Sequence, residues 1–180
     1  LALALILAGA RLSSAGVSPH LVVLLDDSAS MAAVNARGKS ARDRAVRRVL
    51  EEVDRLGNRA RVTLVESGER PSVLVGPAAL AADVRPGLDA WQPEAPHHSL
   101  ALGLRLAREL AGPTGRLLVM SDVTPSPRDP RGPRGEERVL WASVGEPLAN
   151  VGITAAERTI TPAEGRGAVA LTLGNHSDSP

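Results

Sequence analysis

A short apolar run that ends in a cluster of polar residues is the feature that most limits the fold of this chain. Residues 20–31 read His-Leu-Val-Val-Leu-Leu-Asp-Asp-Ser-Ala-Ser-Met. Five consecutive aliphatic residues are typical of a strand buried on both faces, as in a parallel sheet. The strand delivers Asp26, Ser28 and Ser30 onto the loop at its carboxyl end. In open α/β sheets, ligands bind at this end of the strands.

Two helices are predicted further along the chain. In residues 41–56, apolar side chains recur every three to four positions after Ser40 and Asp43, which have the spacing of a capping box. Gly57 is predicted to end this helix in the left-handed conformation. A second helix is predicted over 100–111, where a Gly-Pro pair follows the last apolar residue.

Strands are predicted to alternate with these helices. Pro86 and Gly87 are expected to interrupt any continuous helix within residues 78–91. The alternation indicates a doubly wound α/β domain with a mainly parallel sheet, which we assign to residues 18–150. Apart from the first strand, the segments with the length and composition of strands are 61–65, 72–75, 116–120 and 139–144.

The amino-terminal segment has a different composition. Residues 1–10 are all apolar or glycine and precede Arg11. As a helix they would be about 15 Å long, about half of the ~30 Å hydrocarbon core of a bilayer. We predict residues 1–17 to be the end of a transmembrane helix and a linker. A buried strand, a core helix or the remains of a signal sequence are the alternatives.

The carboxyl-terminal segment, residues 151–180, shows a strand pattern. Val169, Leu171 and Leu173 alternate with smaller or polar residues, which is typical of a half-buried antiparallel strand. Residues 153–160 are its predicted partner. We interpret the pair as the first strands of a β-sandwich domain.

Composition excludes several classes of function. The formal net charge of the 180 residues is +1, which argues against a nucleic-acid partner held by a general basic field. The absence of cysteine excludes disulfides, thiolate metal sites and thiol catalysis.

Residues that could complete a metal site lie in two further loops. Asp122 follows a later apolar strand and should therefore lie at the same sheet edge as Asp26. Ser99, which precedes a helix, is the nearest hydroxyl in the third loop, although a helix cap is its alternative role. Ligand sets made only of oxygen favour Mg²⁺ or a similar hard divalent cation over Zn²⁺. His97 and His98 do not suggest zinc, because adjacent side chains diverge and no suitably spaced third ligand is present.

The chain resembles a von Willebrand factor type A (vWA) domain. The metal-ion-dependent adhesion site of that family uses an Asp-x-Ser-x-Ser motif after the first strand, matched by Asp26, Ser28 and Ser30. An Asp after the fourth strand corresponds to Asp122 in Leu-Val-Met-Ser-Asp. The family also uses a Thr before a later helix. Here His98 stands at the Thr position and Ser99 follows it, so the candidate ligand is a serine.

The resemblance implies protein binding without catalysis. Ser28 and Ser30 would bind the ion directly, while Asp26 and Asp122 would hold its waters, leaving a coordination position for a carboxylate of a protein partner. No general base or nucleophile dyad is evident beside these residues, so no enzymatic activity is predicted. The alternative is a vWA scaffold with a degenerate metal site, acting through complex assembly.

A narrower resemblance covers nearly the whole chain. The apolar start, the linker, the vWA-like domain and the sequence Val-Gly-Glu-Pro-Leu-Ala-Asn-Val-Gly-Ile at 144–153 are similar to bacterial membrane-anchored vWA proteins of the aerotolerance (BatA-like) type. This implies a domain held outside the cytoplasm at the cell membrane. Other vWA proteins or a MoxR-type ATPase system are the implied partners.

The rival interpretation is a response-regulator receiver domain, whose acidic pair also follows the first strand. A receiver needs a phosphoacceptor Asp after its third strand, and residues 72–80 contain none. It also needs a Lys after the fifth strand, whereas Lys39 is the only lysine. Asp26 and Asp27 could also be simple turn formers, which would carry no function.

Overall fold

The computed structural model describes residues 18–95, 99–124, 138–146, 148, 151–161 and 166–175 of the chain. The predictions for residues 1–17, and for His97 and His98, therefore fall outside the described residues. Among the helices that are described, none is long and apolar enough to span a membrane.

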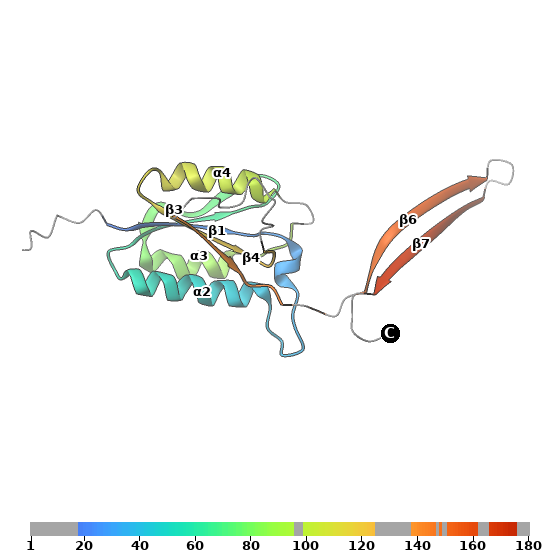
Figure 1. Ribbon diagram of the computed structural model, residues 1–180, viewed down its shortest axis with the longest axis horizontal. Coiled ribbons are helices and arrows are strands. Elements are labelled where there is room, and N and C mark those ends of the chain that lie inside the picture. The colour runs from blue at the N-terminus through green and yellow to red at the C-terminus, as the bar shows by residue number, and fades with distance from the viewer. Residues whose placement is uncertain are drawn as a thin grey trace, which may run out of the picture.

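A five-stranded sheet forms the centre of the α/β domain (Figure 1). Its strand order is β3-β2-β1-β4-β5. β1 pairs in parallel with β2 and β4, β4 pairs in parallel with β5, and β3 is antiparallel to β2. The predicted α/β fold with a mainly parallel sheet is confirmed. The strands are β1 (His20–Leu25), β2 (Arg61–Glu66), β3 (Ser72–Leu80), β4 (Arg116–Ser121) and β5 (Val139–Ser143).

Helices cover both faces of this sheet. α2 (Ala41–Leu56) and α3 (Val84–Ala90) lie below it in Figure 1, and α4 (Leu100–Ala111) lies above it. Two short 3₁₀ turns, η1 (Ala29–Ala32) and η2 (Ala81–Asp83), follow β1 and β3.

Alternation along β1 divides the core into two layers. Leu21, Val23 and Leu25 belong to the cluster that packs against α2 and α3, and Val22 and Leu24 belong to the cluster that packs against α4. All five side chains are at most 2% exposed. The continuous apolar run is therefore explained by burial on both faces, as predicted.

The structure confirms both predicted ends of α2, but the backbone conformation at its carboxyl end differs from the prediction. Ser40 and Asp43 form a complete capping box, in which each side chain accepts a hydrogen bond from the other residue's N–H. Gly57 ends the helix with φ of 78° but ψ of 177°. The positive φ explains the glycine, but the extended ψ means that the predicted left-handed helical cap is wrong.

The expected interruption of the helix at Pro86 and Gly87 is also wrong. Both residues lie within α3, where Pro86 occupies the first turn and its missing N–H would have no helical partner anyway. A Cβ built on Gly87 would lie 2.1 Å from Cγ2 of Val75. The glycine is therefore explained by the close packing of α3 on β3.

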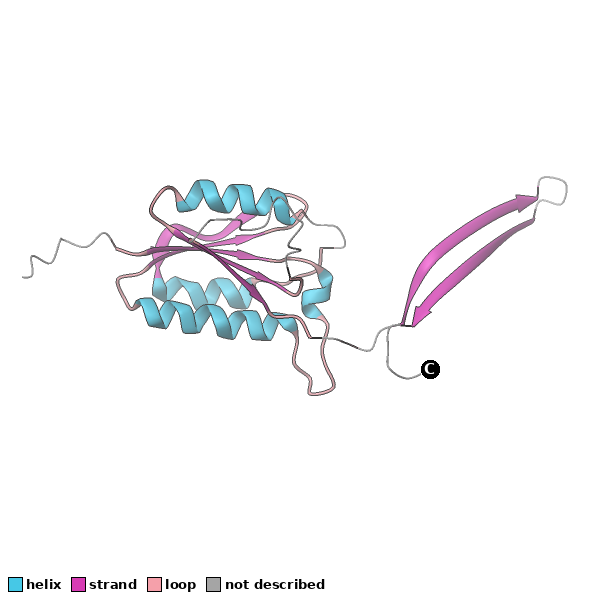
Figure 2. Cartoon of the chain, in the orientation of Figure 1, coloured by secondary structure: helices cyan, strands magenta, loops and turns pink. Residues whose placement is uncertain are grey.

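Residues 151–161 and 166–175 form a separate two-stranded antiparallel sheet, coloured magenta at one end of Figure 2. β6 (Val151–Thr161) pairs with β7 (Arg166–Asn175), which confirms the predicted hairpin with longer strands. Ile153, Val169, Leu171 and Leu173 are 55–65% exposed. The alternating pattern predicts that Val169, Leu171 and Leu173 line a half-buried face, but no other described element covers them.

Candidate metal centre

The register of the sheet aligns the ends of three strands. Leu25 lies opposite Glu66 of β2 and Met120 of β4. The residues that follow, Asp26, Ser67 and Ser121, therefore share the carboxyl edge of the sheet. This edge is where the sequence predicted the candidate site.

Asp26 is a buried carboxylate, 1% exposed, held from two directions. Its Oδ1 accepts a hydrogen bond from the N–H of Ser28 at 3.0 Å. Its Oδ2 accepts one from the hydroxyl of Ser121 at 2.6 Å. The Asp26 N–H donates to the carbonyl of Met120 at 2.9 Å, so the start of this loop is tied to β4. These bonds orient the carboxylate before any ligand arrives.

The two serines of the motif lie together on the turn that follows. The Ser28 and Ser30 hydroxyl oxygens are 3.0 Å apart and share a hydrogen bond. The Ser28 carbonyl accepts the N–H of Met31, which closes the 3₁₀ turn. Met31 is fully buried and anchors the turn in the core, whereas Ser30 remains exposed. The pair therefore presents hydroxyl oxygens at the rim of the site.

Asp122 follows Ser121 directly and carries a carboxylate oxygen that is not satisfied by the described residues. Its Oδ1 is buried and accepts no hydrogen bond there. A buried carboxylate oxygen without a donor is costly, so this atom is suited to binding a cation or a hydrogen-bond donor. The loop behind it is tight, because a Cβ built on Gly145 would lie 2.1 Å from the carbonyl oxygen of Asp122.

Ser99 lies at the start of α4, and its hydroxyl accepts the N–H of Leu102 at 3.3 Å. Its own N–H donates to the carbonyl of Gly68 at 3.4 Å, in the loop after β2. Within the described part of the chain, Ser99 makes no hydrogen bond to Asp26, Ser28, Ser30 or Asp122. Its role as a helix cap is therefore observed directly. Its predicted role as a metal ligand remains a prediction.

Three residues that the sequence did not single out support the site. Ser121 holds Asp26, and the fully buried Ser67 accepts the N–H of Asp27 at 3.0 Å through its hydroxyl. Gly103 lets α4 approach these strands, because a Cβ there would lie 2.8 Å from Cδ1 of Leu24 and 3.3 Å from Cα of Ser67. For the serines, the signal available in the sequence was a small polar residue directly after each buried strand.

The donor set fits a hard divalent cation. It combines two carboxylates with serine hydroxyls, and oxygen ligands of this kind suit Mg²⁺. Within the described ranges, no group of three or more His, Cys, Asp or Glu side chains could hold a metal ion. A site here would therefore depend on hydroxyls as well as on carboxylates.

The fold and this loop cluster define an α/β domain with a polar site at the carboxyl edge of its parallel strands. The model of the von Willebrand factor type A domain family matches residues 21–124, more than half of the chain. The chain belongs to this family. The resemblance noted from the Asp-x-Ser-x-Ser motif is thereby confirmed.

Solved structures with the same fold include two bacterial proteins. The protein BatB from Bacteroides thetaiotaomicron has 15% sequence identity and a TM-score of 0.53, over 89% of this chain and 82% of BatB. An aerotolerance-related membrane protein from Bacteroides fragilis has 18% identity and a TM-score of 0.57, over 85% of this chain and 81% of that one. A comparison with curated protein sequences gave no match. The predicted similarity to aerotolerance-type proteins is thus supported at the level of the fold.

Proposed function

We propose that this vWA domain is a metal-dependent protein-binding module without catalytic activity. The observation that carries the proposal is the buried Oδ1 of Asp122, which no described donor satisfies. It belongs to the residue next to Ser121, whose hydroxyl holds the Asp26 carboxylate. A hard cation at this edge would balance both carboxylates.

Each proposed ligand has a distinct role. Ser28 and Ser30 offer neighbouring hydroxyl oxygens, that of Ser28 buried and that of Ser30 on an exposed residue. Asp122 offers its buried oxygen, and Asp26 supplies a fixed negative charge beneath the loop. Ser99 is the proposed third-loop contributor. A bound Mg²⁺ would supply a positive centre to which a carboxylate of a protein partner can bind.

A scaffold with a degenerate metal site is the second candidate function. It is favoured by the Ser99 hydroxyl, which is already used to cap α4. It is also favoured by His98 at the position where the family has a threonine. Membership of the vWA family favours either candidate over a receiver domain.

The cellular setting is part of the proposal. Similarity in fold to an aerotolerance-related membrane protein supports a place at the cell membrane. We further propose that the domain lies outside the cytoplasm. We propose residues 1–17 as an anchor and linker, 18–150 as the vWA domain and 151–180 as the start of a β-sandwich. Other vWA proteins or a MoxR-type ATPase system are the proposed partners.

Calorimetric titration with Mg²⁺ tests the metal site. We expect the wild-type chain to bind Mg²⁺ and Asp122→Ala to lose this binding. Asp89→Ala, which removes an exposed carboxylate on α3, is the matched control and should bind as wild type does. If the wild type gives no metal-dependent heat, the degenerate scaffold replaces the metal-dependent module.

A further inference from the structure

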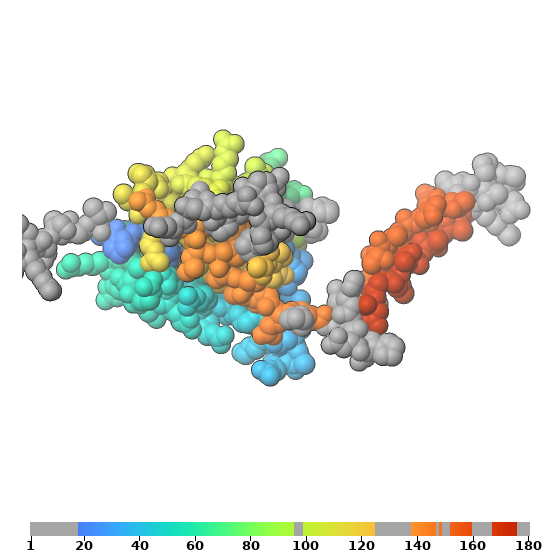
Figure 3. All heavy atoms as spheres, in the orientation of Figure 1, coloured from blue at the N-terminus to red at the C-terminus, as the bar shows by residue number. Residues whose placement is uncertain are grey.

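A groove separates α2 from the edge strand β5. It has a volume of about 420 Å³. Arg44, Arg47 and Arg48 line one side, and residues 142–146 line the other. In Figure 3, the orange surface of the β5 region lies beside the teal surface of α2. The groove is therefore an open surface feature, with the end of β5 and the residues that follow it along one wall and three arginines and Glu51 of α2 along the other.

The strand that forms one wall has an outer edge with which no described strand pairs. β5 pairs only with β4 in the described sheet. The Arg138 carbonyl and the Val144 N–H both bond to β4. Along a strand, the backbone N–H and C=O groups of successive residues point alternately to one side and to the other. The N–H and C=O of Val139, Trp141 and Ser143 therefore point away from β4. Such an edge is a template for an added strand.

The other wall has more exposed cationic than anionic groups. The side chains of Arg47 and Arg48 are 72% and 47% exposed. Both pair with one carboxylate, that of Glu51, at 4.0 and 3.6 Å. Exposed pairs of this kind are weak, so an incoming carboxylate can compete for either guanidinium.

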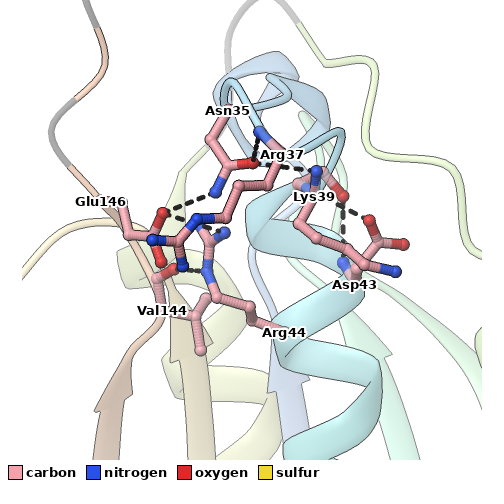
Figure 4. Close-up of polar contacts among 8 residues, drawn as sticks. Asn35, Arg37, Lys39, Asp43, Arg44, Val144 and Glu146 are labelled. Carbon is pink, nitrogen blue, oxygen red and sulfur yellow. Dashed lines mark hydrogen bonds and ion pairs between the residues drawn. The ribbon is translucent and has the colours of Figure 1, made fainter.

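Arg44 fixes the end of the groove (Figure 4). Its Nε donates to the carbonyl of Val144 at 2.7 Å, and its Nη1 lies 3.6 Å from a carboxylate oxygen of Glu146. The same Glu146 oxygen accepts a hydrogen bond from Nδ2 of Asn35 at 2.8 Å. Residues 144–146 are therefore held in place from α2 and from the preceding loop, which gives the groove a defined wall.

We infer that this groove binds an extended acidic segment of a protein partner, which pairs with β5 as an additional strand. In an added strand, side chains alternate between the two faces of the sheet. The side chains on the α2 face would lie beside Ala142 and reach Arg47 and Arg48. A segment with carboxylates at every second position can pair with the backbone of β5 and, at the same time, place its carboxylates near Arg47 and Arg48.

A nucleic acid is a poorer fit. Glu51 and Glu146 also line the groove, and they would repel a continuous phosphate backbone. A peptide whose carboxylates alternate with uncharged side chains can avoid these two carboxylates. The groove lining contains none of the proposed metal ligands, so this inference does not depend on that proposal.

A short synthetic peptide of alternating Glu and Val tests the inference, with fluorescence anisotropy in the presence of EDTA as the measurement. We expect this peptide to bind the full chain and the corresponding Lys-Val peptide not to bind. N-methylation of alternate amides blocks one edge of a strand only. One of the two N-methylated sets should therefore abolish binding and the other should not.

Two arginine variants form a matched pair. Arg47 and Arg105 are both exposed helical residues with a glutamate four positions later, on α2 and α4 respectively. We expect Arg47→Glu to weaken peptide binding at least about tenfold, and Arg105→Glu to change it less than about twofold. The inference is overturned by absence of Glu-Val binding to the wild type, by equal loss in both variants, or by equal effects of the two N-methylated sets.

Discussion

The hydroxyl of Ser121, at the end of β4, donates a hydrogen bond of 2.6 Å to Oδ2 of Asp26, at the end of β1. Ser121 is fully buried and Asp26 is 1% exposed. This bond therefore joins two neighbouring strands directly beneath the candidate metal centre. It also explains how a charged side chain is accommodated at this depth, since a buried carboxylate needs donors.

Removing this donor should affect both stability and metal binding. We expect Ser121→Ala to lower the free energy of unfolding by about 1–3 kcal/mol, because a buried acceptor loses its partner. Mg²⁺ affinity should fall about 10-fold, as is usual when a supporting group is lost. Urea denaturation and calorimetric titration measure the two effects.

Ser72→Ala is the control for this variant. The Ser72 hydroxyl donates to Glu66 at 2.7 Å in an exposed position, so its loss should cost less than about 0.5 kcal/mol. Equal destabilisation by the two substitutions would contradict the role given to Ser121.

Gly145 should matter for the metal centre through its lack of a side chain. A Cβ at this position would lie 2.1 Å from the Asp122 carbonyl oxygen, so Gly145→Ala should displace the Asp122 loop. We expect Mg²⁺ affinity to fall about 10-fold. Gly152→Ala is the control, because nothing lies within 4 Å of its Cβ position. Unchanged Mg²⁺ binding by Gly145→Ala would show that the loop adapts.

Gly103 offers a test based on the sign of a stability change. At an exposed helical site, Gly→Ala stabilises by roughly 0.5–1 kcal/mol. In α4, the added methyl group would lie 2.8 Å from Cδ1 of Leu24, so we expect Gly103→Ala to destabilise the domain by about 1–3 kcal/mol. Thermal unfolding followed by circular dichroism measures the change. A higher melting temperature would contradict the close packing of α4.

Glu52 should make stability depend on pH. Its hydrogen bond to Arg55, together with the charges of Arg55 and Arg116, holds the pKa of Glu52 below its ordinary value of 4.5. The unfolded chain therefore takes up this proton first as the pH falls. The stabilisation is fully present above pH 4.5 and is lost as the pH falls through the lowered pKa.

Glu52→Gln should accordingly differ most from the wild type at neutral pH, and the difference should shrink below pH 4.5. Urea denaturation at a series of pH values measures it. Glu51→Gln is the control, because its side chain is 55% exposed and pairs only on the surface. A difference between Glu52→Gln and the wild type that does not change with pH would rule out this ionisation.

Much of the fold could be predicted because local signals and tertiary environment agree. The capping box at Ser40 and Asp43 sets the start of α2, and the apolar run of β1 requires cover on both faces. The errors arose where contacts distant in sequence decide. Pro86 and Gly87 are expected to interrupt a helix, yet both lie in α3, and position 87 is a glycine because Val75 leaves no room for a side chain.

In the candidate site too, some features could be predicted from local sequence and others depend on contacts between distant residues. The amino-acid sequence by itself determined which oxygen-bearing residues follow the strands, because an apolar run ends where polar residues begin. Only the tertiary structure decided which of them contact one another. Strand register brings Ser121 under Asp26, and the start of α4 commits the Ser99 hydroxyl to a helix cap. These relationships depend on backbone placement across strands, which local sequence patterns do not encode.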